Sequence, residues 1–242
     1  MEIETKEGKI LEIEQVEPAK IEERSFQIIG EELKQKGITL PKEQEAVIKR
    51  CIHTSADFDY ASNLVFSDHA VERGIAALKD GASIVTDTRM GWSGINKKRL
   101  ERFGGKAYCF MADEDVAEAA KRNGTTRASA SMDKACGLEE DLIFAVGNAP
   151  TALIRLYELI REGKIRPRLI IGVPVGFVNV VQAKELILSL EEIPYIVARG
   201  RKGGSNIAAC ICNALLLGPG EICVYQHIDH APVHQDDQAD TD

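Results

Sequence analysis

The feature that most constrains the fold is a regular alternation of short apolar runs with amphipathic segments, from about residue 83 onward. The apolar runs are bounded by Gly, Pro or charged residues, which is typical of strands buried on both faces. The five runs are ASIVTD, KAYCFM, EDLIFAVG, PRLIIGV and PYIVARG. Helical patterns lie between and after them, at roughly 95–103, 113–122, 126–136, 150–162, 178–190 and 205–217. This alternation predicts an α/β fold, with three layers in which helices cover both faces of a parallel sheet.

The chain before Gly81 carries mainly helical patterns, at roughly 19–36, 42–55 and 67–79. Residues 1–17 are expected to form an N-terminal extension, in which the alternating segment KILEIEQV is a candidate for an added edge strand. Residues 18–225 are expected to form one domain. The acidic tail, 226–242, is expected to be disordered, and its histidines are not expected to bind a metal because Pro232 interrupts any helix there.

Charge and hydropathy exclude several classes of protein. The net charge is −8, but most of the acidity lies in the first 24 residues and in the last 14, so the body of the chain is nearly neutral. Without a broad basic field, a nucleic-acid partner is not expected. No apolar run approaches the ~20 residues that span a bilayer, and the charged N-terminus lacks the apolar core of a signal peptide. We therefore expect a cytoplasmic protein with no membrane partner.

In a parallel sheet of this kind, ligands bind beyond the carboxyl ends of the strands, so the loops after the strands are the candidate site. After the third strand, Asn148 is predicted to cap the next helix, with Pro150 in its first turn. Such a loop directs free backbone N–H groups toward a ligand. A well-capped helix without a binding role explains the same pattern.

The loop after the fifth strand combines positive charge with flexible backbone. Arg199, Arg201 and Lys202 precede two glycines, the second of which is Gly204, and Ser205 is predicted to cap the last helix. Charge and exposed N–H groups together can hold an anion, although a solvated basic loop has the same composition. The pattern is not a P-loop, and the loop after the fourth strand, GVPVGFV, is not GxGxxG, so a dinucleotide is disfavoured.

Another cation stands at a predicted helix start. In NGTTRASASMDKA, Thr125 or Thr126 begins a helix and Arg127 lies in its first turn, where a cation opposes the helix dipole. This placement indicates an anionic partner, which a neighbouring Asp could equally provide. Converging cations and N–H groups suit a large ligand with several carboxylates. No nucleophile elbow, metal-ligand set or carboxylate pair stands out.

Several segments resemble the precorrin-8X methylmutases of cobalamin biosynthesis: ERSFQII (23–29), CIH (51–53), VGNAPTAL (146–153), GVPVGFV (172–178) and ARGRKGGSNIAA (198–209). The resemblance implies a flavodoxin-like five-stranded parallel sheet and a homodimer with active sites near the subunit interface. It also implies an isomerase that moves a methyl group from C-11 to C-12 of (cobalt-)precorrin-8, giving hydrogenobyrinate or its cobalt form, cobyrinate, without a cofactor.

The same resemblance assigns roles to individual residues. His53 matches the family's catalytic histidine, which exchanges a proton with the tetrapyrrole, although a histidine near a helix C-terminus also suits the dipole. An ordinary histidine has a pKa of about 6.5, so both protonation states are accessible near neutral pH. Arg50 lies one helical turn before His53 and shares its face. The candidate substrate-binding residues are Ser25, Arg50, Thr126, Arg127, Asn148, Arg199, Arg201, Gly204 and Ser205.

Two other functions remain open at the level of sequence. A non-catalytic tetrapyrrole carrier would use the same cleft, and a nucleotide-binding module could share the fold. The presence of both His53 and Arg127 favours the enzyme over the carrier. We expect the cobalt-containing substrate rather than the metal-free one, although a metal carried by the substrate leaves no ligand pattern in the protein.

Overall fold

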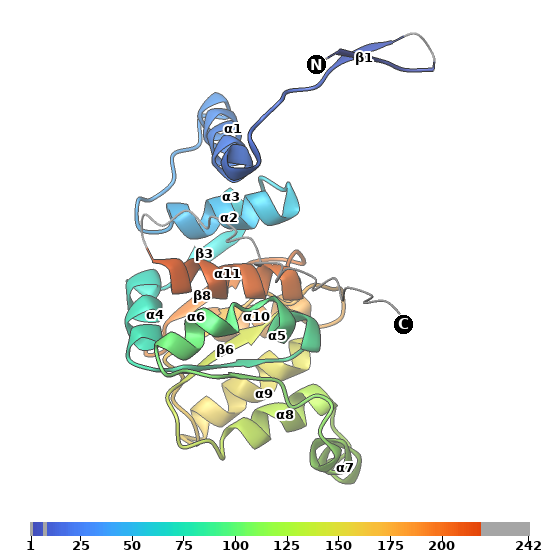
Figure 1. The fold of residues 1–242 in the computed structure, drawn as a ribbon. Helices are drawn as coiled ribbons and strands as arrows, with labels where there is room; N and C mark the ends of the chain where they lie inside the picture. Colours follow the sequence, from blue (N-terminus) through green and yellow to red (C-terminus); the bar gives the residue numbers. More distant parts are fainter. Residues whose placement is uncertain (1, 7–8, 219–242) are drawn as a thin grey trace, which may run out of the picture.

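A computed structural model of the chain describes residues 2–6 and 9–218. Its central sheet has the spatial strand order β3-β8-β7-β6-β4-β5 (Figure 1). The strands are β3 (Leu64–Phe66), β4 (Ser83–Thr86), β5 (Ala107–Tyr108), β6 (Leu142–Val146), β7 (Leu169–Gly172) and β8 (Tyr195–Ala198). Strands β4 to β8 are parallel and coincide with the five predicted runs. Counted along the chain, these five strands have the order 2-1-3-4-5 of flavodoxin-like sheets, which confirms the predicted fold class.

The sheet has one further strand, β3, that the sequence did not predict. It pairs antiparallel with β8, with Val65 opposite Val197. A three-residue strand between two helices is too short to show an alternating pattern, because periodicity needs four or more residues to be recognised. The parallel sheet therefore continues into one antiparallel edge strand.

Every predicted helix is present, with ends that shift by a few residues. Before the parallel strands come the 3-10 turn η1 (Pro18–Lys20), α1 (Ile21–Gln35), α2 (Glu45–Ser55), α3 (Tyr60–Asn63) and α4 (Ala70–Lys79). The remaining helices are α5 (Arg89–Gly94), α6 (Lys97–Arg102), α7 (Glu114–Asn123), α8 (Arg127–Ala135), α9 (Pro150–Arg161), α10 (Val180–Leu188) and α11 (Ser205–Leu217). The two short helices α3 and α5 were not predicted.

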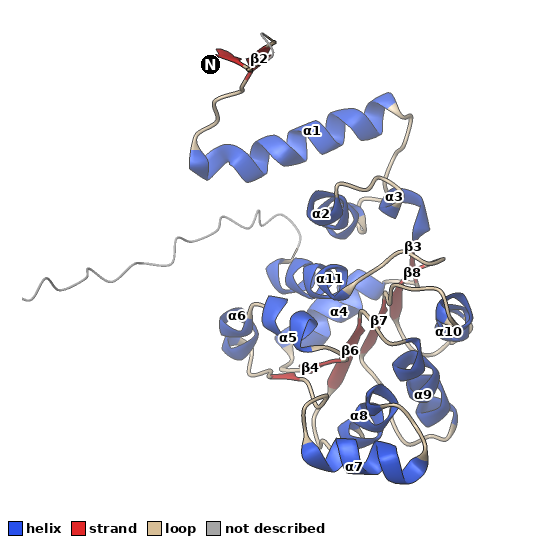
Figure 2. Ribbon diagram, turned by 90° about the vertical axis from the view of Figure 1, so that its right-hand side faces the viewer, coloured by secondary structure: helices blue, strands red, loops and turns tan. Residues whose placement is uncertain are grey.

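Strand side chains alternate between two apolar cores, one on each face of the sheet. Ile84 and Ile143 belong to the core that also contains side chains of α2, α4 and α11. Val85 and Phe144 point to the other face and pack among α7, α8, α9 and α10. Figure 2 shows the two groups of helices on opposite sides of the strands. The strands are apolar throughout because both of their faces are buried.

The first helices form an additional layer beyond α11. In Figure 1, α11 lies on the sheet, α2 lies over α11, and α1 lies over α2. Helix α11 can accept this second layer because it is apolar on nearly all sides, with Ile207, Ala208, Ile211, Cys212 and Leu215 all buried. The segment around His53 is therefore carried by a helix that rests on another helix.

The N-terminal extension forms a hairpin away from the body of the protein (Figures 1 and 2). Strand β2 (Ile10–Glu12) pairs antiparallel with β1 (Glu2–Glu4), and Ile3 is opposite Leu11. The predicted strand is thus present, but it pairs within a separate two-stranded sheet and not with an edge of the central sheet. The predicted tail, 226–242, lies outside the described residues. In the described part of the chain, no helix combines the length and the apolar character that crossing a membrane would require.

Candidate active site

Hydrogen bonds between loops join the carboxyl ends of the parallel strands into one edge. The Gly204 N–H donates to the Val173 carbonyl at 2.9 Å, and the Gly176 N–H donates to the Arg201 carbonyl at 3.3 Å. The hydroxyls of Thr88 and Ser205 lie 2.7 Å apart, which links the loop after β4 to the first turn of α11. The loops after β4, β7 and β8 thus hold one another in place.

The buried carboxylate of Asp87 fixes the loop between β6 and α9. Its oxygens accept hydrogen bonds from the backbone N–H groups of Gly147 (2.9 Å), Asn148 (2.8 Å) and Ala149 (2.6 Å). Asp87 is only 1% exposed. Burial raises the pKa of the Asp87 carboxyl, whereas the three N–H donors act in the opposite direction.

This arrangement corrects the prediction for Asn148. The N-cap of α9 is Ala149, without a side-chain capping bond, and the Asn148 side chain does not cap the helix. The N–H groups of Gly147, Asn148 and Ala149 donate hydrogen bonds to Asp87. They are therefore not free to bind a ligand, whereas the sequence had suggested that they would be. The side chain of Asn148 is exposed at the edge and remains available for a contact.

The start of α11 also differs from the prediction. Its N-cap is Gly204, with φ of 145°, and Ser205 is the first helical residue. Ser205 is buried and its hydroxyl pairs with Thr88, so it stabilises the edge rather than capping the helix. At the preceding residue, a Cβ on Gly203 would lie 2.0 Å from the Val173 carbonyl oxygen, so only glycine allows the two loops to approach this closely.

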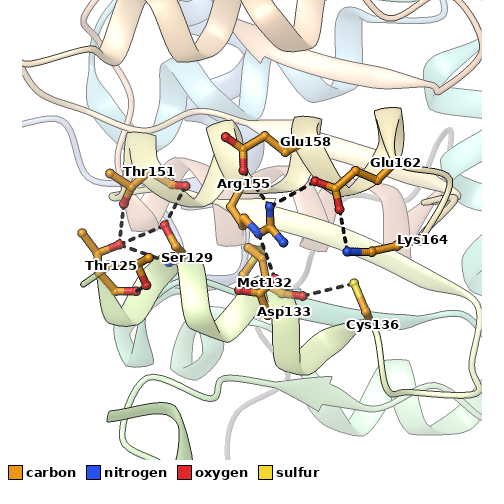
Figure 3. Close-up of polar contacts among 11 residues, drawn as sticks. Thr125, Ser129, Met132, Asp133, Cys136, Thr151, Arg155, Glu158, Glu162 and Lys164 are labelled. Atoms are coloured by element: carbon orange, nitrogen blue, oxygen red, sulfur yellow. Dashed lines mark hydrogen bonds and ion pairs between the residues drawn. The ribbon is translucent and has the colours of Figure 1, made fainter. Parts of the chain in front are cut away.

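The start of α8 is as predicted, with Thr126 as its N-cap. The Thr126 hydroxyl accepts a hydrogen bond from the Ser129 N–H at 3.1 Å and lies 2.8 Å from the Thr151 hydroxyl in the first turn of α9. Figure 3 shows Ser129 and Thr151 facing each other between the two helices. Arg127 follows in the first turn and is exposed. Its guanidinium forms no ion pair with a described residue, so the neighbouring Asp considered above does not pair with it.

Farther along, an ion-pair network fixes α8 against α9. The Arg155 guanidinium donates to Asp133 on α8 at 2.8 Å and to Glu158 on its own helix at 2.7 Å (Figure 3). These carboxylates raise the pKa of Arg155. Because Thr126 and Arg155 tie the two helices at separate points, the position of Arg127 relative to α9 is well defined.

The three cations of the last loop have different partners. Arg199 donates to Glu185 at 3.0 Å, and the Lys202 ammonium contacts the carboxylates of Asp57 and Asp59 at 2.6 and 2.5 Å. Arg201 lies 5.4 Å from the centre of the Phe177 ring and forms no ion pair with a described residue. All three side chains are exposed.

Exposed apolar side chains lie near these cations, on the loop after β7. Phe177 is 81% exposed and Val178 is 79% exposed. Phe177 also lies beside the Arg201 guanidinium, so an apolar surface and a cation are neighbours on this edge. The edge can therefore offer both an apolar surface and carboxylate-binding groups to one ligand.

A second group of predicted residues meets at the contact between α1 and α2. The His53 imidazole stacks on the Phe26 ring, with centroids 5.3 Å apart and an interplanar angle of 28°. The Arg50 guanidinium lies 5.4 Å from the same ring and pairs with Glu22 at 3.2 Å. Ser25 is one residue before Phe26, and its hydroxyl donates to the Ile21 carbonyl at 2.9 Å. Arg50 and His53 thus share one face, as predicted, and both contact the Phe26 ring. Ser25 is adjacent to Phe26 in the chain, and we call Ser25, Arg50 and His53 the His53 group.

The imidazole of His53 is exposed and makes no hydrogen bond to a described residue. Both ring nitrogens are therefore open to a ligand, while the face of the ring is supported by Phe26. Helix α2 ends two residues later, where Ala56 adopts a left-handed conformation and its N–H bonds to the Ile52 carbonyl. The helix end is closed by this backbone bond and does not depend on His53.

The structure does not bring His53 and Arg127 together. His53 lies on α2, in the layer over α11, whereas Arg127 lies on α8, which packs on the opposite face of the sheet (Figures 1 and 2). Among the described residues, no hydrogen bond or ion pair connects the His53 group with Thr126 or Arg127.

Residues that the sequence did not identify support both groups. Asp87 ends the apolar run ASIVTD, and an acid at the end of a buried strand was a signal that could have been followed. Phe26 lies within the ERSF motif. Lys184 is fully buried on α10 and binds two carbonyls of the last loop, and no local pattern marks it.

Comparison with known proteins gives consistent matches over the domain. The family model of precorrin-8X methylmutase matches residues 20–217. A cobalt-precorrin-8 methylmutase of Leptospira interrogans is 48% identical over 204 residues, which cover 81% of this chain and 92% of that protein. A precorrin-8X methylmutase of Pseudomonas aeruginosa is 37% identical over 79% of this chain and 91% of its own length. A crystal structure of precorrin-8x methyl mutase from Thermus thermophilus is 39% identical, covers 81% of this chain and 96% of its own, and superposes with a TM-score of 0.71.

Proposed function

The chain belongs to the precorrin-8X methylmutase family and is a methyl-shifting isomerase of cobalamin biosynthesis, and on this premise we propose that His53 is its proton donor and acceptor. The reaction is an isomerisation: a methyl group leaves C-11 of the tetrapyrrole and bonds to C-12. A proton that His53 gives to the macrocycle is returned in the course of the reaction, so that no atoms are gained or lost. The observation that carries this proposal is an exposed imidazole whose ring is held by Phe26 and whose nitrogens have no partner among the described residues.

Recognition of the substrate is assigned to cations and polar groups around the sheet edge. Arg127 and Arg201 have exposed guanidinium groups without a carboxylate partner in the described part of the chain, and each can bind a carboxylate with two parallel hydrogen bonds. Arg199, Asn148 and Thr126 line the same edge. Gly204 and Ser205 fix the backbone of the loop that carries Arg199 and Arg201. The apolar side chains of Phe177 and Val178 suit the face of a macrocycle.

We further propose that the enzyme is a homodimer in which each active site takes residues from both subunits. Within one protomer, His53 and Arg127 belong to layers on opposite faces of the sheet. A two-fold axis presents the same surfaces of both subunits to each other. The His53 group of one subunit can therefore approach Thr126 and Arg127 of the other subunit. Substrate would then contact both.

Mixing two impaired variants at low substrate concentration tests this shared site. If His53 acts with the Arg127 of the other subunit, a hybrid of His53→Ala and Arg127→Ala subunits contains one intact and one doubly deficient site. Subunits exchanged at equal ratio should recover about one quarter of wild-type activity at low substrate concentration, since half of the dimers are hybrids. Activity that stays at the average of the two variants, or a single-chain mass by light scattering, would contradict the shared site.

Arg127→Ala should weaken binding of the corrin product by about 1.5–3 kcal/mol, the value of a charge-assisted hydrogen bond. The fold should be unaffected, because the side chain is exposed and forms no hydrogen bond or ion pair with a described residue. Isothermal calorimetry measures the change. Arg122→Ala, an exposed arginine at the end of α7, serves as the matched control and should bind as wild type does. An unchanged dissociation constant for Arg127→Ala would remove Arg127 from the site.

We propose the cobalt-containing compound, cobalt-precorrin-8, as the natural substrate. Three relatives with 44–48% identity carry the name cobalt-precorrin-8 methylmutase. Anaerobic incubation of the enzyme with the cobalt form and, separately, with metal-free precorrin-8X distinguishes the two, because formation of the corrin is visible by absorption spectroscopy. Faster conversion of the metal-free compound would overturn the proposal, and binding without any spectral change would indicate a carrier.

A further inference from the structure

Lys184 on α10 is a fully buried lysine, with an exposed fraction of 0%. Its ammonium donates to the carbonyls of Gly200 and Lys202, both at 2.8 Å, and no carboxylate of the described residues lies within ion-pair distance of it. Burial lowers the pKa of Lys184 to about 8. Burying an ammonium without a counter-ion is costly. The two carbonyl oxygens of the loop offset part of this cost by accepting its hydrogen bonds.

The carbonyls of this loop alternate in direction. Those of Gly200 and Lys202 point inward to the Lys184 amine, whereas the carbonyl of Arg201 accepts a hydrogen bond from the Gly176 N–H. Gly200 has a φ of 82°, which favours glycine. The inward carbonyls thereby determine how the chain around Arg201 is shaped.

The same loop continues to the helix that carries His53. The Lys202 ammonium contacts Asp57 and Asp59, which follow directly after α2. On the other side, Glu185 beside Lys184 binds Arg199. One buried amine therefore lies beneath a loop whose side chains reach both the sheet edge and the end of α2.

We propose that Lys184 is a positioning residue: by holding the carbonyls of Gly200 and Lys202, it fixes the loop in the shape that presents Arg199 and Arg201 to the carboxylates of the substrate. The inference rests on the proposed role of these two arginines. Lys184 itself does not touch the substrate. It acts by reducing the number of conformations that the loop has to give up when it binds.

Lys184→Met removes the ammonium and both of its hydrogen bonds, and it keeps an unbranched side chain that can fill the space. We expect the corrin product to bind about tenfold more weakly, a loss of the order of one hydrogen bond, although Arg199 and Arg201 are both still present. Limited trypsin digestion should cut after Arg199, Arg201 or Lys202 about tenfold faster than in the wild type. The exposed Lys164→Met should change neither quantity.

The wild-type enzyme provides a test that does not depend on the variant folding. Trypsin should cut native protein after Arg161 and Lys164, in the exposed turn that follows α9, well before it cuts the loop of residues 199–202. Early cleavage in that loop would overturn the proposal, as would Lys184→Met with wild-type digestion and binding. Arg201→Ala tests the role of the arginines apart from the role of Lys184. If Arg201→Ala does not weaken product binding, the proposed role of the arginines fails. Digestion of Lys184→Met still shows whether Lys184 orders the loop.

Discussion

His53→Ala should lower turnover by about 10²–10⁴-fold, which is typical for the loss of a general acid or base. The variant should fold and still bind the corrin product, because the cations of the sheet edge do not depend on the imidazole. Within residues 2–6 and 9–218, the imidazole forms no hydrogen bond or ion pair, so what is lost is its stacking contact with Phe26. Visible spectroscopy of the reaction and calorimetry of product binding, made on one preparation, separate catalysis from recognition.

The competing explanation is that His53 serves the end of α2. In that case the substitution would lower the free energy of unfolding by up to ~2 kcal/mol and leave the activity of each folded molecule intact. Since the helix end is already closed by the Ala56 N–H, we expect little change in melting temperature. His69→Asn is the control: His69 is also exposed, lies at the start of α4 with a φ of 56°, and its side chain pairs with Glu72. Near-normal turnover in His53→Ala would show that the rearrangement does not need this histidine.

Asp87→Ala should lower the free energy of unfolding more than His53→Ala or Arg127→Ala does, because three backbone donors lose their acceptor at once. An unsatisfied buried donor costs ~1–3 kcal/mol, and since the Asn148 and Ala149 donors are only partly buried we expect a total near ~3 kcal/mol. Urea denaturation monitored by circular dichroism measures the change.

Two further variants identify the cause. Asp87→Asn keeps one accepting oxygen but places an amide donor opposite the N–H groups, so its loss should lie between those of wild type and Asp87→Ala. Asp68→Ala, at an exposed position before α4, should stay within about 0.5 kcal/mol of wild type. If Asp87→Ala is as stable as Asp68→Ala, water replaces the carboxylate without cost, and the loop before α9 does not depend on Asp87.

The sequence predicted the parallel part of the fold because its signals are local. Strands such as Leu142–Val146 are buried on both faces, so an uninterrupted apolar run identifies them. Thr126 was correctly expected at a helix start because its cap bond reaches only as far as Ser129. A structural feature that depends on residues close together in the chain can therefore be predicted from the sequence.

The wrong prediction for Asn148, and the contacts that the sequence did not reveal, have the opposite property. Asn148 is a residue type that often caps helices, but here the loop before α9 is held by the carboxylate of Asp87, which is 61 residues away along the chain. The amine of Lys184 binds carbonyls 16 and 18 residues away. The contact of His53 with Phe26 joins two helices with no shared pattern. No local signal describes such long-range bonds, so the resemblance to a family identified the His53 group where the residue pattern alone left it open.

Because α2 packs on α11 and not on the sheet, His53 and the loops of the sheet edge lie in separate layers of the fold, which the ion pairs of Lys202 with Asp57 and Asp59 connect. Changes in α1 and α2 would alter the group proposed to exchange the proton, while the edge proposed to bind the substrate keeps its own framework of Asp87, Lys184 and Ser205. Conversely, if these proposals hold, loops of the edge can adapt to a macrocycle with or without a central metal while the proposed acid–base group remains as it is. A scaffold of this design allows selection to retune substrate preference without rebuilding the chemistry.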